Sequence, residues 1–371
     1  MKWLAAGLHA AALSVALCVQ SLTGPLAGAW LFFHLASCAV MLYSPEPPPP
    51  KNLLWKATLA WLLMVTASAF IFRPVPNGAA TMWFLFAMPS LALCMKKEYL
   101  PDFLKATLAV LTVYAFGLLL QFALNVHYTL ADYGGMLNHS AMAWPLLDPN
   151  NAAAVLNAGL IPCVYMALRR PRCLSAVLIF ALALATTGSK AGAITAAVCC
   201  TALVIQRYRI HLPTAALAIA ILIVCLLPFT GGVQRALEGS LATRIPVWSA
   251  SASLLTVRPL TGIGLGMFKP YYDKVRTESV TAGFYAHNDT IQFGVEMGIP
   301  AMIVFVALAL VAALSTRYGN IASGAVLAAL LMQSMFEFQF YIPSVSLLAG
   351  LALAYHINQP RRVYVASHVL F

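Results

Sequence analysis

The stretch LKATLAVLTVYAFGLLLQFALNV, from Leu104 to Val126, carries no charged side chain except Lys105 near its start. A helix needs about 20 predominantly apolar residues to cross the hydrocarbon core of a bilayer, and this stretch reaches that length. Similar stretches recur along the chain, which is 61% hydrophobic and 9% charged, with a mean hydropathy of +0.84. A soluble domain has about 25% charged residues. The sequence therefore predicts an integral membrane protein.

The apolar stretches predict an all-α fold in which one polytopic helical bundle of about 12 transmembrane helices fills residues 1–371. The N-terminal apolar run is interpreted as a retained first helix, because no clear signal-peptide cleavage site follows it. A transmembrane β-barrel is excluded, because its strands would alternate polar and apolar residues. The expected spans are 3–22, 26–43, 53–72, 79–95, 104–126, 150–168, 173–188, 191–205, 213–229, 289–314, 320–337 and 340–356.

The positions of the Lys and Arg residues predict the orientation of these spans. If the N-terminus is cytoplasmic, most basic residues fall on short inner connectors, and the outer segment around 127–148 has none. This distribution follows the positive-inside rule, so we expect both termini in the cytoplasm. The formal net charge of +11 is therefore mostly a topology signal, and nucleic acid is not expected as a partner. The eight Cys lie in or beside apolar segments without CxxC spacing, which favours buried thiols over metal ligands.

Two outer segments are longer than ordinary connections: a first loop at 127–149 and a large loop at 230–287. Long ordered loops tend to be functional, and the large loop keeps several basic residues on the side where topology disfavours them. Its apolar part from Ile245 to Leu255 predicts a short helix near the membrane. Its glycine-rich part TGIGLGMF, from Thr261 to Phe268, lacks the spacing of a nucleotide-binding loop and predicts a tight turn.

Several polar motifs follow one another in order over about 148–300, and each is weak alone. They are DPNNAA (Asp148–Ala153), TTGSKAG (Thr186–Gly192), Arg244 before Trp248, a segment with Pro259, Gly262, Gly264 and Phe268, and His287–Asn288 followed by Gln292, Glu296, Gly298 and Ile299. In this combination the chain resembles the O-antigen ligase and O-antigen polymerase superfamily of bacterial membrane glycosyltransferases. The first 120 residues resemble only other membrane helices. Lys190 departs from the family pattern, which more often has Arg at this place.

The resemblance implies a GT-C-like, metal-independent enzyme without a cofactor. Such an enzyme takes a glycan from an undecaprenyl-diphosphate carrier and attaches it to an acceptor at the periplasmic face of the bacterial inner membrane. The loops 127–149 and 230–287 would then be periplasmic, and the second would carry the active site. An O-antigen ligase acting on lipid A–core is favoured, while a polymerase or a protein O-oligosaccharyltransferase stays open. A multi-span transporter is the alternative from another class, but no internal repeat supports it.

A polyprenyl diphosphate presents its charged head at the membrane surface, where fixed cations would hold it. Arg244 and Lys190 are predicted to bind the diphosphate, and Arg244 would also stabilise the charge that develops on the leaving group. His287 is predicted to act either as the base for the acceptor hydroxyl or as a phosphate ligand. The sequence does not separate these two roles.

Five further polar residues have both a supporting and a structural interpretation. Glu296 is expected within a membrane span, where a carboxylate suggests function, or else an ion pair with Lys190 or Arg244. Asn288 and Asp148 each suit the start of a helix, but each could also contact substrate. Glu337 is a candidate for acceptor contact, and Gln292 is part of the motif that follows His287.

Overall fold

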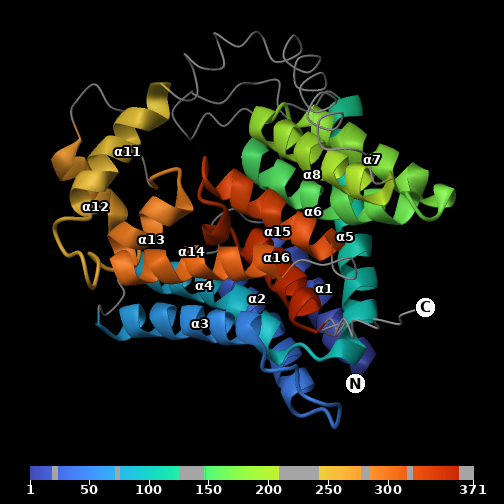
Figure 1. The fold of residues 1–371 in the computed structure, drawn as a ribbon, viewed down its shortest axis with the longest axis horizontal. Helices are drawn as coiled ribbons and strands as arrows, with labels where there is room; N and C mark the ends of the chain where they lie inside the picture. Colours follow the sequence, from blue (N-terminus) through green and yellow to red (C-terminus); the bar gives the residue numbers. More distant parts are fainter. Residues whose placement is uncertain are drawn as a thin grey trace, which may run out of the picture.

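The computed structural model describes residues 1–18, 24–71, 76–124, 146, 148–208, 242–276, 285–315 and 321–358. Every regular element within these residues is a helix, so the predicted all-α fold is confirmed for them. Figure 1 shows the helices as one bundle with α11 and α12 gathered beside α13 at one end. The α-helices are α1 (Lys2–Cys18), α2 (Gly24–Leu42), α3 (Leu53–Ile71), α4 (Pro76–Cys94), α5 (Leu100–Ala123), α6 (Pro149–Ala167), α7 (Leu174–Thr186), α8 (Lys190–Tyr208), α11 (Ala242–Leu254), α12 (Phe268–Val275), α13 (Asp289–Met297), α14 (Ile299–Leu314), α15 (Ile321–Ser334) and α16 (Pro343–Ile357).

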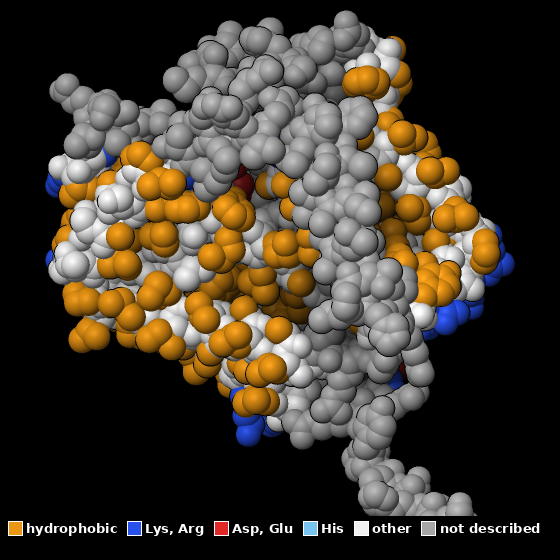
Figure 2. Space-filling model, turned by 45° about the horizontal axis from the view of Figure 1, so that its top comes forward, with side chains coloured by type: hydrophobic (Ala, Val, Ile, Leu, Met, Phe, Trp, Pro, Cys, Tyr) orange, Lys and Arg blue, Asp and Glu red, His pale blue; other side chains and the backbone are white. Residues whose placement is uncertain are grey.

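Two helical segments are long and apolar enough to cross a bilayer, Lys97–Ala123 and Lys190–Tyr208. Eight further apolar helices within the described residues are shorter. The expected span at 213–229 lies outside the described residues, as do most of the loop 127–149 and the start of the loop 230–287. Figure 2 shows hydrophobic side chains over much of the visible described surface, with Lys and Arg at its edges. The total of about 12 transmembrane helices stays a prediction.

The expected single span 289–314 is wrong, because the helix breaks at Gly298. This glycine has φ 91° and ψ 164°, which ends α13 and lets α14 begin in a new direction. Its φ lies in a region that L side chains rarely adopt. α13 has nine residues and a length of about 14 Å, so it is too short to cross a bilayer. The long apolar run of α14 concealed this break in the sequence.

The glycine-rich segment forms the predicted tight turn, and it holds the break between α13 and α14. Gly262, Gly264 and Gly266 have φ of 72°, 105° and 73°. The amide of Gly264 donates to the carbonyl of Glu296 at 3.0 Å, and the amide of Ile299 donates to the carbonyl of Pro259 at 2.7 Å. The turn thereby fastens the described part of the large loop to the bundle.

The packing of α6 and of α11 positions the site at one end of the bundle. α6 packs between α7, α8 and α15, and its residues from Asn151 to Ile161 are all buried. α11 packs on α13, which continues into α14 across the glycine break. The starts of α6 and α8 and the end of α15 therefore lie close to the start of α13.

We expect Gly298→Ala to lower the thermal unfolding temperature in detergent by several degrees. A Cβ at this position would lie 2.4 Å from the carbonyl oxygen of Leu260, and the positive φ alone costs about 1–3 kcal/mol. Gly117→Ala in α5 is the matched control, because nothing lies within 4 Å of its Cβ position. Alanine favours a helix interior, so this control should keep or raise the unfolding temperature. Equal temperatures for the two variants would contradict the prediction.

Candidate active site

A buried carboxylate, Glu337, lies just beyond the end of α15 with 2% of its surface exposed. Its Oε1 accepts hydrogen bonds from the Arg244 guanidinium and from Asn150 Nδ2, the latter at 2.8 Å. Its Oε2 lies 2.8 Å from Nδ1 of His287. A charge buried in a protein is tolerated only when it is paired and hydrogen-bonded. Glu337 therefore gathers three side chains from α6, α11 and the approach to α13.

His287 is held in an uncommon backbone conformation. Its φ of 50° lies in the left-handed region, which non-glycine residues rarely adopt unless the surrounding structure fixes them. Trp248 Nε1 donates to the carbonyl of His287 at 3.3 Å, and Gln292 Oε1 accepts from the amide of Ala286 at 2.7 Å. The imidazole also packs edge-on against Phe338, at 5.4 Å between ring centroids. The strained turn thus aims the ring at Glu337.

The pairing with Glu337 determines which nitrogen of His287 is available for chemistry. An ionised carboxylate only accepts hydrogen bonds, so Nδ1 carries the proton and donates to Oε2. In the neutral ring Nε2 is then the basic nitrogen. The His287 side chain is 34% exposed, against 17% for Arg244 and 3% for Glu337. The basic nitrogen therefore belongs to the most accessible member of the cluster.

Asn288 and Asp148 both cap helices that enter the cluster. Asn288 Oδ1 accepts from the amide of Ile291 at 3.1 Å, and its Nδ2 donates to the carbonyl of Met335, which ties α13 to the end of α15. Asp148 Oδ1 accepts from the amide of Asn150 at 2.7 Å at the start of α6. Burial, followed by the nearby charge of Glu337, raises the pKa of Asp148 to about 6. Asp148 therefore supports the cluster by capping the helix start that carries Asn150.

Lys190 is the first residue of α8, and its neighbour Ser189 connects this helix start to the cluster. Ser189 Oγ donates to Asn150 Oδ1 at 2.7 Å and accepts from the amide of Gly192 at 3.1 Å. Asn150 in turn donates to Glu337. Lys190 is half-buried and forms no ion pair with the part of the chain that the structure describes. Its charge adds to the positive end of the α8 helix dipole at this end of the bundle.

Glu296 does not pair with Lys190 or Arg244, so that expectation is wrong for the described residues. Its Oε1 accepts from the amides of Gly266 at 3.1 Å and Phe268 at 3.3 Å. Its Oε2 accepts from the hydroxyl of Tyr341 at 2.8 Å. Because Glu296 lies in the short α13, it is also not within a membrane-spanning helix. Its contacts give it a structural role in holding the glycine turn.

The DPNNAA motif predicted either a helix start or contact with sugar hydroxyls through Asp148, Asn150 and Asn151, and Asn150 is the residue of this motif that touches Glu337. Ser189 and Trp248 were missed as supporting residues, although both lie in quoted motifs. A proline at the first position of a helix, followed by two asparagines, was a signal that one asparagine side chain points away from the helix start. Among the described residues, no group of three or more His, Cys, Asp or Glu side chains has an arrangement suited to a metal ion.

Comparison with known proteins gives one family match. Residues 175–306 match the family model described as O-antigen ligase. The matched region runs from α7 into α14 and contains Lys190, Arg244 and His287, while Asp148 and Glu337 lie outside it. A search of curated proteins found no match.

We expect Glu296→Gln to flatten the pH dependence of stability. Burial raises the pKa of Glu296 from an ordinary 4.5 to about 7 in the folded protein. The folded state then keeps a proton that the unfolded state has released, so this group's contribution is full below pH 4.5 and is lost as the pH rises through about 7. Thermal unfolding in detergent at pH 5 and pH 8 would measure it.

In that experiment the unfolding temperature of the wild type should fall from pH 5 to pH 8 by more than that of Glu296→Gln. Asp273→Asn is the control, because the ion pairs with Lys269 and Arg276 lower the pKa of this exposed carboxylate instead of raising it. Parallel curves for the wild type and Glu296→Gln would contradict the assignment.

Proposed function

We propose that this chain, which belongs to the O-antigen ligase superfamily of bacterial membrane glycosyltransferases, transfers a glycan from undecaprenyl diphosphate to an acceptor at the periplasmic face of the inner membrane. The observation that carries the proposal is the meeting of Arg244 and His287 on the buried carboxylate of Glu337. A cation and a base held side by side are the two groups that such a transfer needs.

The Arg244 guanidinium would bind the donor diphosphate. The guanidinium has five N–H donors and can bind several acceptors at once, so it would bind phosphate oxygens while it stays bonded to Glu337. Lys190 and the start of α8 supply further positive charge at the same end of the bundle. When the bond between the sugar C1 and the phosphate oxygen breaks, negative charge grows on the diphosphate. Fixed cations near a low-dielectric boundary stabilise that charge without having to reorganise.

His287 would activate the acceptor. The Glu337 carboxylate holds Nδ1–H, so Nε2 is oriented to take the proton of the acceptor hydroxyl as its oxygen attacks C1. The same carboxylate stabilises the imidazolium that results. No carboxylate nucleophile is needed, and direct attack with inversion at C1 is the simpler course. The second role of His287, as a phosphate ligand, would use the same ring position, and the experiments below distinguish the two.

The acceptor we propose is lipid A–core, which makes the chain an O-antigen ligase. A polymerase would use a second lipid-linked repeat, and a protein glycosylating enzyme would use a periplasmic protein. A transporter is disfavoured, because the described cluster of Arg244, His287 and Glu337 lies at one end of the bundle, whereas transporters bind substrate near the membrane midplane.

Arg244→Ala and His287→Ala are each expected to abolish transfer. The test is complementation of a deletion strain of the source organism, with expression checked and lipopolysaccharide separated on a gel. If the chain is a ligase, both variants should lose the polysaccharide ladder, keep an intact core band and accumulate lipid-linked polymer. The control is Lys269→Ala, which removes a cation of the same loop that pairs with Asp273 on the surface of α12.

The other outcomes of this test each lead to a different conclusion. A core carrying a single repeat would indicate a polymerase. A full ladder with altered glycosylation of surface proteins would indicate a protein acceptor. A full ladder and unchanged proteins in both variants would refute the proposed site.

Glu337→Gln is expected to reduce the turnover of the purified enzyme at least about tenfold with a smaller change in KM, because glutamine keeps the shape but removes the charge that supports His287. A His287 that only held phosphate would instead lose donor affinity, which would appear mainly in KM. Asp273→Asn is the control for removing an acidic group elsewhere. Full turnover in Glu337→Gln would show that its charge plays no part in catalysis.

A further inference from the structure

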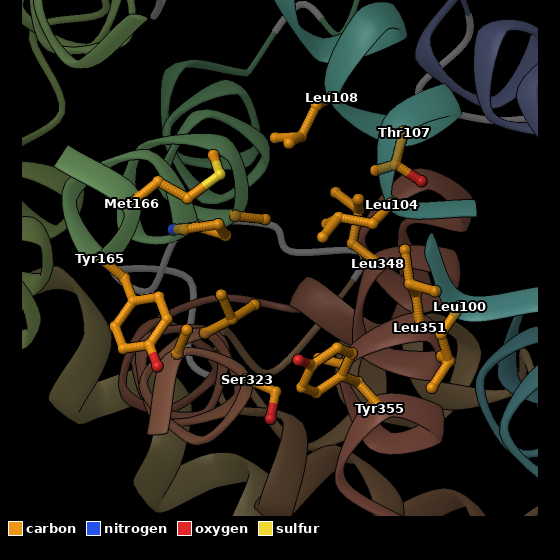
Figure 3. Close-up of a pocket in the computed structure, with 15 residues that line it drawn as sticks. Leu100, Leu104, Thr107, Leu108, Tyr165, Met166, Ser323, Leu348, Leu351 and Tyr355 are labelled. Carbon is orange, nitrogen blue, oxygen red and sulfur yellow. The ribbon is translucent and has the colours of Figure 1, made fainter. Parts of the chain in front are cut away.

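A cavity lies at the opposite end of the bundle from Glu337. It has a volume of about 250 Å³ and is enclosed by the first half of α5, the second half of α6, the first half of α15 and the second half of α16. Figure 3 shows side chains from these helices, among them Leu104, Met166 and Leu348, around one shared space. Asn150 and Met166 lie roughly 24 Å apart along α6, so this cavity is separate from the site around Glu337.

The lining of this cavity suits hydrocarbon and not a sugar. Leucine, alanine, valine, proline and methionine side chains make up most of it, and the hydroxyl groups come from Thr107, Ser323 and two tyrosines. A sugar would need many polar partners, whereas a flexible chain needs only apolar surface. The cavity also lies between helices of the predicted membrane bundle, where the surrounding solvent is itself hydrocarbon.

A cationic cavity of about 500 Å³ adjoins the apolar one, and Tyr165 lines both. Arg169 and Arg207 lie in its wall together with Gln206. The Arg169 guanidinium carbon lies 4.4 Å from the ring centroid of Tyr165, and Arg207 Nε donates to the carbonyl of Leu168 at 3.4 Å. Neither arginine forms an ion pair with an acidic side chain of the described residues. Two positive charges therefore stand beside the apolar cavity.

We propose that this end of the bundle binds one anionic phospholipid, with an acyl chain in the apolar cavity and the phosphate between Arg169 and Arg207. The two arginines favour an anionic head group over a zwitterionic one, since basic residues near a membrane surface attract anionic lipid. Under the expected topology the site faces the cytoplasmic leaflet. The proposal does not depend on the glycan that the enzyme transfers.

Native mass spectrometry of the full-length protein in detergent tests the head-group contact. Phosphatidylglycerol and phosphatidylcholine with the same acyl chains are the two probes. We expect phosphatidylglycerol to bind at least about fivefold more tightly, and Arg169→Gln with Arg207→Gln to remove that preference. The matched control is Arg170→Gln with Arg172→Gln, two exposed arginines of the same connector that do not line the cavity. This control should keep the preference.

A cavity-filling variant tests the acyl-chain contact. Ala322→Phe places a ring in the apolar cavity and should weaken the binding of both lipids severalfold, and Ala322→Leu should weaken it less. Unfolding temperatures near the wild-type value would establish that the variants fold. Three results would each overturn the proposal. The first is equal binding of the two lipids to the wild type, and the second is an equal loss of the phosphatidylglycerol preference in the two double-arginine variants. The third is unchanged lipid binding in a folded Ala322→Phe variant.

Discussion

A carboxylate removed from water has to be surrounded by hydrogen-bond donors, and Glu337 meets this requirement only when distant parts of the chain come together. Its donors are Asn150, Arg244 and His287, from three separate segments. Leaving a buried charge without its partners costs several kcal/mol. The interactions that stabilise this end of the bundle are therefore the same interactions that place the Arg244 cation beside the His287 imidazole. Ser189 extends the arrangement, because it links the start of α8 to Asn150.

The two buried glutamates near this end differ in the donors that surround them, and this difference separates structure from chemistry. Glu296 accepts from two backbone amides and from the Tyr341 hydroxyl, none of which carries a charge. Its environment favours the protonated form, which suits a carboxyl group that fixes a turn. Glu337 instead faces the cation of Arg244 and the imidazole of His287. Of the two, Glu337 is therefore the one that joins the side chains to which we assign the reaction.

The sequence predicted the helices well because apolar runs of this length have few alternatives in a bilayer. It missed the break at Gly298, because the run continues unchanged in polarity, although glycine before Ile299 and Pro300 was a signal for a new helix start. Arg244 and His287 were recognisable as polar residues in an otherwise apolar chain. The central position of Glu337 was not, since its partners are 50 and 93 residues away and no local pattern encodes such a contact.

Small residues explain how the polar cluster can be built among apolar helices. Lipid gives little hydrophobic drive for helices to associate, so close packing has to hold them together. A Cβ at Gly192 would lie 2.4 Å from the Cβ of Ala153, so only glycine lets α8 approach α6 this closely. The approach allows Asn157 Nδ2 to donate to the carbonyl of Gly192 at 3.0 Å. That bond and the glycine contact fix the start of α8, and with it the position of Lys190, against the helix that carries Asn150. Uncharged residues thus fix the start of α8 beside the helix that contributes Asn150 to the charged cluster.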